Sequence, residues 1–202
     1  EWSWNLEGRT EREFAEAWAV HEGFDNPEAV GEWSDLMGPV EADVYDSDFP
    51  TCYSWGKALQ MVKNRQRPVL GEGMFRYYAA PNDFDHKAAQ CERALEIAQK
   101  AGNAELANES RITLSYVRLA KQVYLVAEQV STGDLTQIET QNTLRSALAG
   151  LQKAGDENIT AIREWRAALG PEPWHPRVYD ALKGTEYTVR GIVNNITFTR
   201  FY

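Results

Sequence analysis

Three long segments of the chain carry apolar residues three and four positions apart, and this spacing limits the possible folds more than any other feature. The segments are residues 83–101, 106–130 and 138–165, and a glycine follows each of the first two. Such spacing places the apolar residues on one helix face, which must be buried against a partner. Long amphipathic helices joined by short turns pack as an antiparallel bundle. The sequence therefore predicts a mainly all-α fold, with the third helix bending or breaking at Gly155.

Helix start signals also occur ahead of these segments. Thr10 followed by Glu13 is a capping box, which predicts a first helix that ends near Gly23. The pair Asn26-Pro27 supplies a cap and a first-turn proline for a second helix.

Proline interrupts the pattern that follows. The second helix is expected to break or kink at Gly38-Pro39, because proline lacks the N–H that a helix interior uses. A further short helix is then expected over residues 40–45. Another helix is expected to begin near Thr51.

Residues 66–82 are the least regular stretch and are expected to form an ordered loop with one helical turn. This loop separates the N-terminal helices, residues 10–66, from a long-helix bundle with its C-terminal tail, residues 83–202. Residues 1–9 are expected to be an extended segment. Together these parts are predicted to form one compact unit.

The C-terminal tail has a different composition. Gly184 is expected to end a short helix that begins near Arg177. Residues 187–202 are rich in β-branched and aromatic side chains, which predicts a short β-strand or an extended arm.

Composition excludes several function classes. The formal net charge of -9 disfavours nucleic acid as a partner, because binding phosphates needs clustered Lys and Arg. No apolar run approaches the roughly 20 residues that span a bilayer, so no membrane partner is expected. The acidic chain is expected to be soluble, and the compartment stays open.

Neither a metal site nor a cofactor site is predicted. The three histidines, His21, His86 and His175, are scattered, and two cysteines cannot make a cysteine-based zinc site. Nucleotide-binding and nucleophile-elbow motifs are absent from the sequence. Thirty Asp and Glu residues guarantee that some carboxylates lie close together, so no catalytic pair can be selected.

The remaining functional signal lies in the first residues. Trp2, Trp4 and Asn5 combine aromatic faces with an amide, which suits the wall of a sugar-binding site. The alternative is that the tryptophans pack under the first helix as hydrophobic staples. Trp174 and His175 lie before Pro176 and are candidates for lining a cleft, with a plain turn as their alternative.

The run from Trp4 to Ala19, WNLEGRTEREFAEAWA, resembles the end of the catalytic (β/α)8 barrel in glycoside hydrolases of the α-glucuronidase and β-hexosaminidase-like type. In such enzymes the last strand delivers a Trp-Asn pair to the barrel mouth, and a helical C-terminal domain often follows the last barrel helix. The resemblance implies that Trp4 and Asn5 contact sugar. It also implies that the acid and base carboxylates lie in an upstream barrel domain, outside this chain.

The expected function is therefore that of a helical C-terminal portion of a carbohydrate-active glycoside hydrolase. This portion would brace the barrel, line part of the carbohydrate cleft or provide a homo-oligomer contact, and would not be catalytic alone. One alternative is a stand-alone helical protein-interaction module. Another is a bundle that binds a small molecule near Trp174 and three aromatic residues of the irregular loop, Phe75, Tyr77 and Tyr78.

Overall fold

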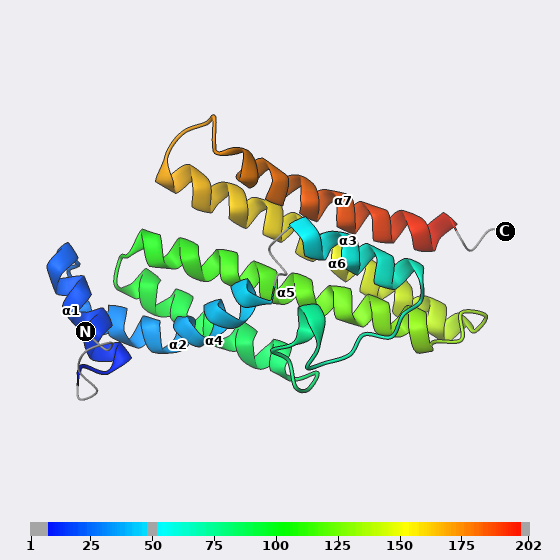
Figure 1. The fold of residues 1–202 in the computed structure, drawn as a ribbon, viewed down its shortest axis with the longest axis horizontal. Helices are drawn as coiled ribbons and strands as arrows, with labels where there is room; N and C mark the ends of the chain where they lie inside the picture. Colours follow the sequence, from blue (N-terminus) through cyan, green and yellow to red (C-terminus); the bar gives the residue numbers. More distant parts are fainter. Residues whose placement is uncertain (1–7, 48–51, 199–202) are drawn as a thin grey trace.

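The computed structural model describes residues 8–47 and 52–198, and within these ranges every regular element is helical (Figure 1). The predicted mainly all-α fold is confirmed. The elements, in chain order, are α1 Glu11–Glu22, α2 Pro27–Asp46, α3 Cys52–Lys63, the 3₁₀ turn η1 Gly73–Phe75, α4 Asp83–Lys100, α5 Ala104–Thr132, α6 Ile138–Leu169 and α7 Pro176–Phe198.

Helix α5 forms the centre of the bundle. It packs along its length against α4 and α6, the two helices that precede and follow it, and it also contacts α2 and α3. Helix α7 lies on α6 and α3, and α1 lies at one edge, where it packs against α2 (Figure 1).

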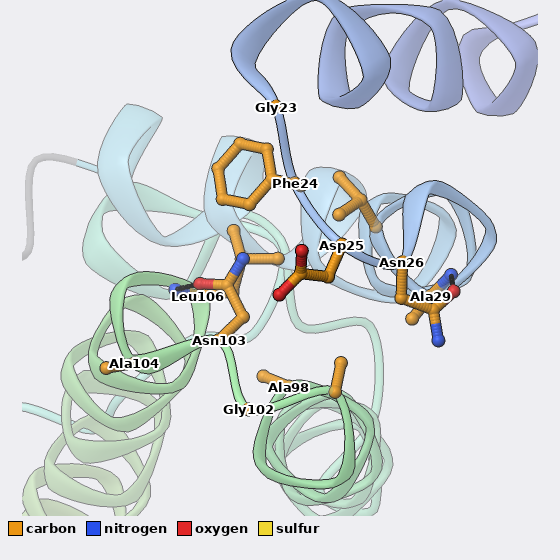
Figure 2. A pocket seen from close by; sticks show the side chains of 12 residues that line it. Gly23, Phe24, Asp25, Asn26, Ala29, Ala98, Gly102, Asn103, Ala104 and Leu106 are labelled. Atoms are coloured by element: carbon orange, nitrogen blue, oxygen red, sulfur yellow. Dashed lines mark hydrogen bonds between the residues drawn. The ribbon is translucent and has the colours of Figure 1, made fainter.

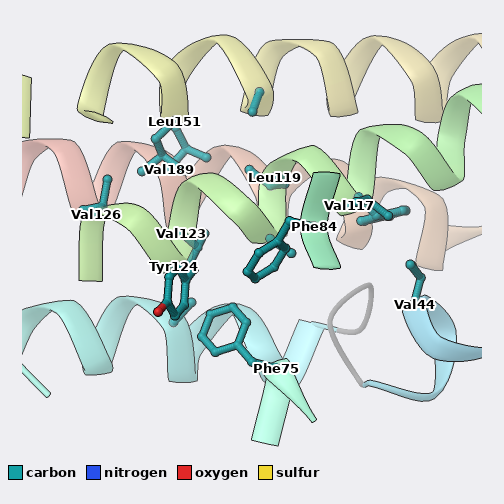
Figure 3. Packing of buried hydrophobic residues seen from close by; sticks show 14 of the residues in the cluster. Val44, Phe75, Phe84, Val117, Leu119, Val123, Tyr124, Val126, Leu151 and Val189 are labelled. Carbon is teal, nitrogen blue, oxygen red and sulfur yellow. The ribbon is translucent and has the colours of Figure 1, made fainter. Parts of the chain in front are cut away.

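The predicted irregular loop, residues 66–82, is an ordered loop that contains the turn η1. Its residues Phe75 and Tyr78 are buried against aromatic rings of the long helices, as Figure 3 shows for Phe75. The Phe75 ring lies 5.6 Å from that of Tyr124, and the Tyr78 ring stacks on Phe84 at 4.0 Å. This aromatic packing anchors the loop to α4 and α5.

The start of α1 is as predicted. The Thr10 hydroxyl accepts a hydrogen bond from the Glu13 backbone N–H at 3.2 Å, and the Glu13 carboxylate accepts one from the Thr10 N–H at 2.8 Å. Gly23 ends the helix with a φ of 77°, a left-handed conformation that glycine adopts without strain.

The predicted break at Gly38-Pro39 is wrong, because α2 continues through both residues to Asp46. Both lie on the exposed side of the helix, where water can replace the hydrogen bond that proline cannot donate. The buried stripe of Met37, Val40 and Val44 keeps its spacing across the proline. The free energy gained by burying that stripe outweighs the tendency of proline to break a helix.

The predicted break at Gly155 is absent, because α6 continues through this residue from Ile138 to Leu169. The glycine lies beneath Val189 of α7, and a Cβ at position 155 would be 2.9 Å from a Val189 methyl carbon. Gly155 therefore allows α6 and α7 to approach closely.

The predicted strand or extended arm is also wrong over the described part of the tail. Helix α7 runs to Phe198, and Gly184 lies inside it. The β-branched residues fall at helical spacing and bury one face against α3 and α6, so packing overrides their strand preference. The buried residues of this face are Leu182, Thr185, Thr188, Val189, Ile192 and Ile196.

One buried polar network ties three helices together. The amide of Asn158 on α6 donates to the Ser115 hydroxyl on α5 at 2.9 Å and accepts from the Thr185 hydroxyl on α7 at 2.8 Å. All three side chains are buried, so each hydrogen bond avoids the cost of an unsatisfied polar group. The network sets the register of α5, α6 and α7.

Because the tail is helical, two substitutions on α7 should differ markedly in their effect on the free energy of unfolding. Ile192→Ala should lower the free energy of unfolding by about 3 kcal/mol, because it leaves a cavity at a side chain that is 0% exposed. Tyr187→Ala, at a side chain that is 68% exposed, should change it by less than about 0.5 kcal/mol. Urea unfolding measures both, and equal effects would contradict the helical register.

Candidate functional site

The predicted sugar-contacting residues Trp2, Trp4 and Asn5 lie outside the described residues. The first described helix after them is α1, which begins at Glu11.

Trp174 and His175 form the connection between α6 and α7. The Trp174 indole N–H donates to the Gly170 carbonyl at 3.0 Å, and its ring stacks on Tyr179 at 5.9 Å. His175 Nδ1 accepts from the Arg177 backbone N–H at 3.3 Å, at the start of α7. These contacts connect residues of the turn with one another and with the start of α7.

The four aromatic residues that were expected near a small-molecule site, Phe75, Tyr77, Tyr78 and Trp174, each have different contacts. Phe75 and Tyr78 are core residues, whereas the Tyr77 hydroxyl donates to the Asp46 carboxylate near the end of α2. Trp174 contacts Gly170 and Tyr179 in the α6–α7 connection.

Helix α1 packs against α2 with a largely polar side. Arg12 and Glu16 lie over Gly31, where an added Cβ would be 2.6 Å from the Glu16 Cγ and 3.0 Å from the Arg12 Cγ. Arg12 also pairs with Glu16 at 3.0 Å and with Asp35 of α2 at 3.4 Å. Ala19 is the buried apolar residue of α1.

The aromatic residues of α1 do not lie in the bundle core. Phe14 and Trp18, one helical turn apart, are 45% and 43% exposed, and the Trp18 ring contacts Phe24 with its centroid at 5.3 Å. Amphipathic helices normally bury their aromatic side. Partly exposed aromatic side chains arranged in this way are typical of a contact surface.

Two carboxylates lie near each other within the bundle. Glu41 of α2 and Glu109 of α5 are both partly buried, and the Trp165 indole N–H donates to Glu109 at 2.8 Å. Burial and the charge of Glu109 raise the pKa of Glu41 to about 7. Burial also raises the pKa of Glu109, although the bond from Trp165 opposes this shift.

This acid pair was not selected from the sequence, because thirty carboxylates offered no way to choose. A signal was nonetheless present. Glu41 falls within the apolar stripe of α2, between Val40 and Val44, and Glu109 lies between the buried residues Leu106 and Ile112 of α5. A carboxylate within an apolar stripe is expected to lose solvent and to titrate unusually.

A groove of about 940 Å³ lies between α4 and α6, with α5 as its floor. Arg118 of α5 crosses it, pairing with Glu92 of α4 at 2.8 Å and with Glu157 of α6 at 3.7 Å. Leu114 and Ala161 contribute an apolar floor, and the described lining residues include no aromatic side chain. A sugar-binding wall normally uses an aromatic face, so this groove does not match the predicted site.

A smaller cavity of about 240 Å³ lies where the α1–α2 and α4–α5 turns meet (Figure 2). Asn26 and Asn103 line it, and their side-chain oxygens already cap α2 and α5 by accepting from backbone N–H groups at 3.1 and 3.0 Å. Asp25 also lines the cavity, and its carboxylate disfavours an anion there. The cavity is therefore explained as the space between two turns whose asparagines cap α2 and α5.

The described side chains offer neither a reactive thiol nor a metal site, and the described helices include no membrane span. Burial raises the pKa of the Cys91 thiol to about 12, so it stays protonated and unreactive at neutral pH. Within residues 8–47 and 52–198, no three His, Cys, Asp or Glu side chains are grouped to hold a metal ion. None of the described helices is both long enough and apolar enough to cross a membrane.

Comparison of the chain with protein-family profiles, with curated proteins and with solved structures finds no match.

The contacts of Trp174 predict a role in stability. Trp174→Ala should lower the free energy of unfolding by about 1–2 kcal/mol, because it removes the stack on Tyr179 and the bond to Gly170. Trp174→Phe keeps a ring for stacking and should recover part of the loss. Thermal unfolding compares the variants, and an unchanged stability of Trp174→Ala would contradict this role.

Proposed function

We propose that the chain is a helical C-terminal region of a carbohydrate-active glycoside hydrolase, which braces a catalytic barrel through α1. In this proposal Trp4 and Asn5 contribute to one side of the substrate cleft. The acid and base carboxylates belong to the barrel.

The observation that carries the proposal is the orientation of α1. The helix turns Arg12 and Glu16 toward α2, while Trp18 remains 43% exposed on another side. The resemblance assigns this same segment to the last helix of a barrel, whose apolar side would pack against barrel strands. A helix shared by two domains needs two packing faces, and the partly exposed side of α1 that carries Phe14 and Trp18 is available as the second.

The rest of the bundle suits a bracing role. Its buried network connects α5, α6 and α7, and α2 joins α1 to α4 and α5. A protein-interaction module is the second candidate, because the aromatic side of α1 would equally suit a separate protein partner. The coding sequence upstream of Glu1 distinguishes them: a barrel-sized reading frame favours the hydrolase.

The proposal predicts that the 202-residue chain alone does not hydrolyse aryl glycosides or aryl glucuronides. The acid pair Glu41 and Glu109 is partly buried between helices, unlike two carboxylates that flank a sugar in an open cleft. Release of nitrophenol from the aryl substrates measures the activity. Turnover that copurifies with the chain would overturn the proposal.

A second prediction concerns Trp18 in the protein that joins the chain to its upstream segment. Trp18→Ala should destabilise the joined protein by about 1–2 kcal/mol more than the chain alone, because the barrel would bury the rest of the ring. Tyr187→Ala, exposed on α7, is the matched control and should have a small effect in both. Equal effects of Trp18→Ala in the two proteins would argue against a barrel on this face.

A further inference from the structure

Glu41 occupies a position that usually holds an apolar residue. It lies on α2 between Val40 and Val44, both of which are buried. One carboxylate oxygen, Oε1, is shielded from solvent and has no hydrogen-bond partner among the described residues. A charged carboxylate in this position loses hydration without compensation, whereas a protonated one loses much less.

Glu109 of α5 supplies a second negative charge that acts on Glu41. Its carboxylate accepts a hydrogen bond from the Trp165 indole of α6 at 2.8 Å. That bond stabilises the ionised form of Glu109. Glu41 is therefore the member of the pair on which a proton relieves both the burial and the repulsion.

Among the described residues around Glu41, the cations are already paired with other carboxylates. On α4, the Cys91 thiol interacts with Glu41, and Lys87 is committed to Asp43. On α5, Glu105 adds a further negative charge near Glu109. From α1, Arg12 is committed to Glu16 and Asp35, beside Gly31 and away from Glu41.

Neutral groups complete the surroundings. Tyr45 lies one turn beyond Glu41 on α2 and interacts with both carboxylates and with Thr113 of α5. Its ring meets that of Tyr116 edge-on at 6.3 Å. Burial raises the pKa of Tyr116, and desolvation also raises the pKa of Tyr45, although that side chain is 42% exposed. Both tyrosines therefore stay neutral near pH 7.

We infer that Glu41 and Glu109 form a proton-operated latch between α2 and α5, closed when Glu41 carries a proton and loosened when both carboxylates are ionised. Helix α2 also packs against α1 and α4. The inference concerns the bundle itself and does not depend on the proposed hydrolase.

The sign of the pH dependence follows from the direction of the shift. In the folded chain the pKa of Glu41 is raised from 4.5 to about 7. The folded state therefore binds the proton more tightly than the unfolded state does. The stabilisation is fully present below about pH 4.5 and is lost as the pH rises through about 7.

The test measures urea unfolding of the complete chain between pH 5.5 and 8.5. The unfolding equilibrium constant should rise with pH below about 7, by at most about tenfold per pH unit, the limit for one proton. Glu41→Gln should remove this rise and be more stable than the wild type at pH 8.5. Hydrogen exchange should show faster opening of α2 at high pH in the wild type and not in Glu41→Gln.

The matched control is Glu164→Gln, because Glu164 is an exposed carboxylate next to Trp165 on α6. It should follow the wild-type pH dependence. If Glu41→Gln does not fold, Glu109→Gln keeps an acceptor for Trp165 and should shift the transition to lower pH by removing the repulsion. A wild type without the rise, or a Glu41→Gln or Glu109→Gln variant that behaves like the wild type, would overturn the latch.

Discussion

Burial of α5 is the constraint on which the other helices depend. Of its 29 residues, 16 are buried, and they face α2, α3, α4 and α6 around the helix circumference. A helix covered on most sides needs apolar residues on most sides, and burying them provides the main stabilisation of the bundle. Among the polar groups on α5 that are also buried, the Ser115 hydroxyl accepts a hydrogen bond from Asn158 of α6.

Much of this fold was predictable because its strongest signals are local or periodic. The capping box of Thr10 and the turn glycine Gly23 define the ends of α1 through hydrogen bonds within a few residues. The errors occurred where distant packing decided the outcome. Pro39 lies on the exposed side of a helix whose other side is buried, and Gly155 serves the approach of Val189 from α7. Neither relation is visible in a local window of sequence.

In the candidate site, too, local features could be predicted from the sequence, whereas features that depend on distant packing could not. The capping box of Thr10 and Glu13 predicts α1, but it does not say which side of that helix meets the bundle. The structure adds that Arg12 and Glu16 take that side while Trp18 stays half exposed. The acid pair required knowledge of two helices far apart in sequence, because the pKa of Glu41 is raised by its burial in the bundle and then by the charge of Glu109 on α5.

The division of the apolar core into two clusters has a consequence for how the molecule opens. Five residues, Ala19, Val30, Ala98, Leu106 and Ala107, form a small cluster beneath α1 that is separate from the main core. Small side chains dominate it, so separating α1 exposes little apolar surface and costs less than global unfolding. In the 202-residue chain alone, α1 and its turn are thus expected to open as a unit at a lower free-energy cost than global unfolding.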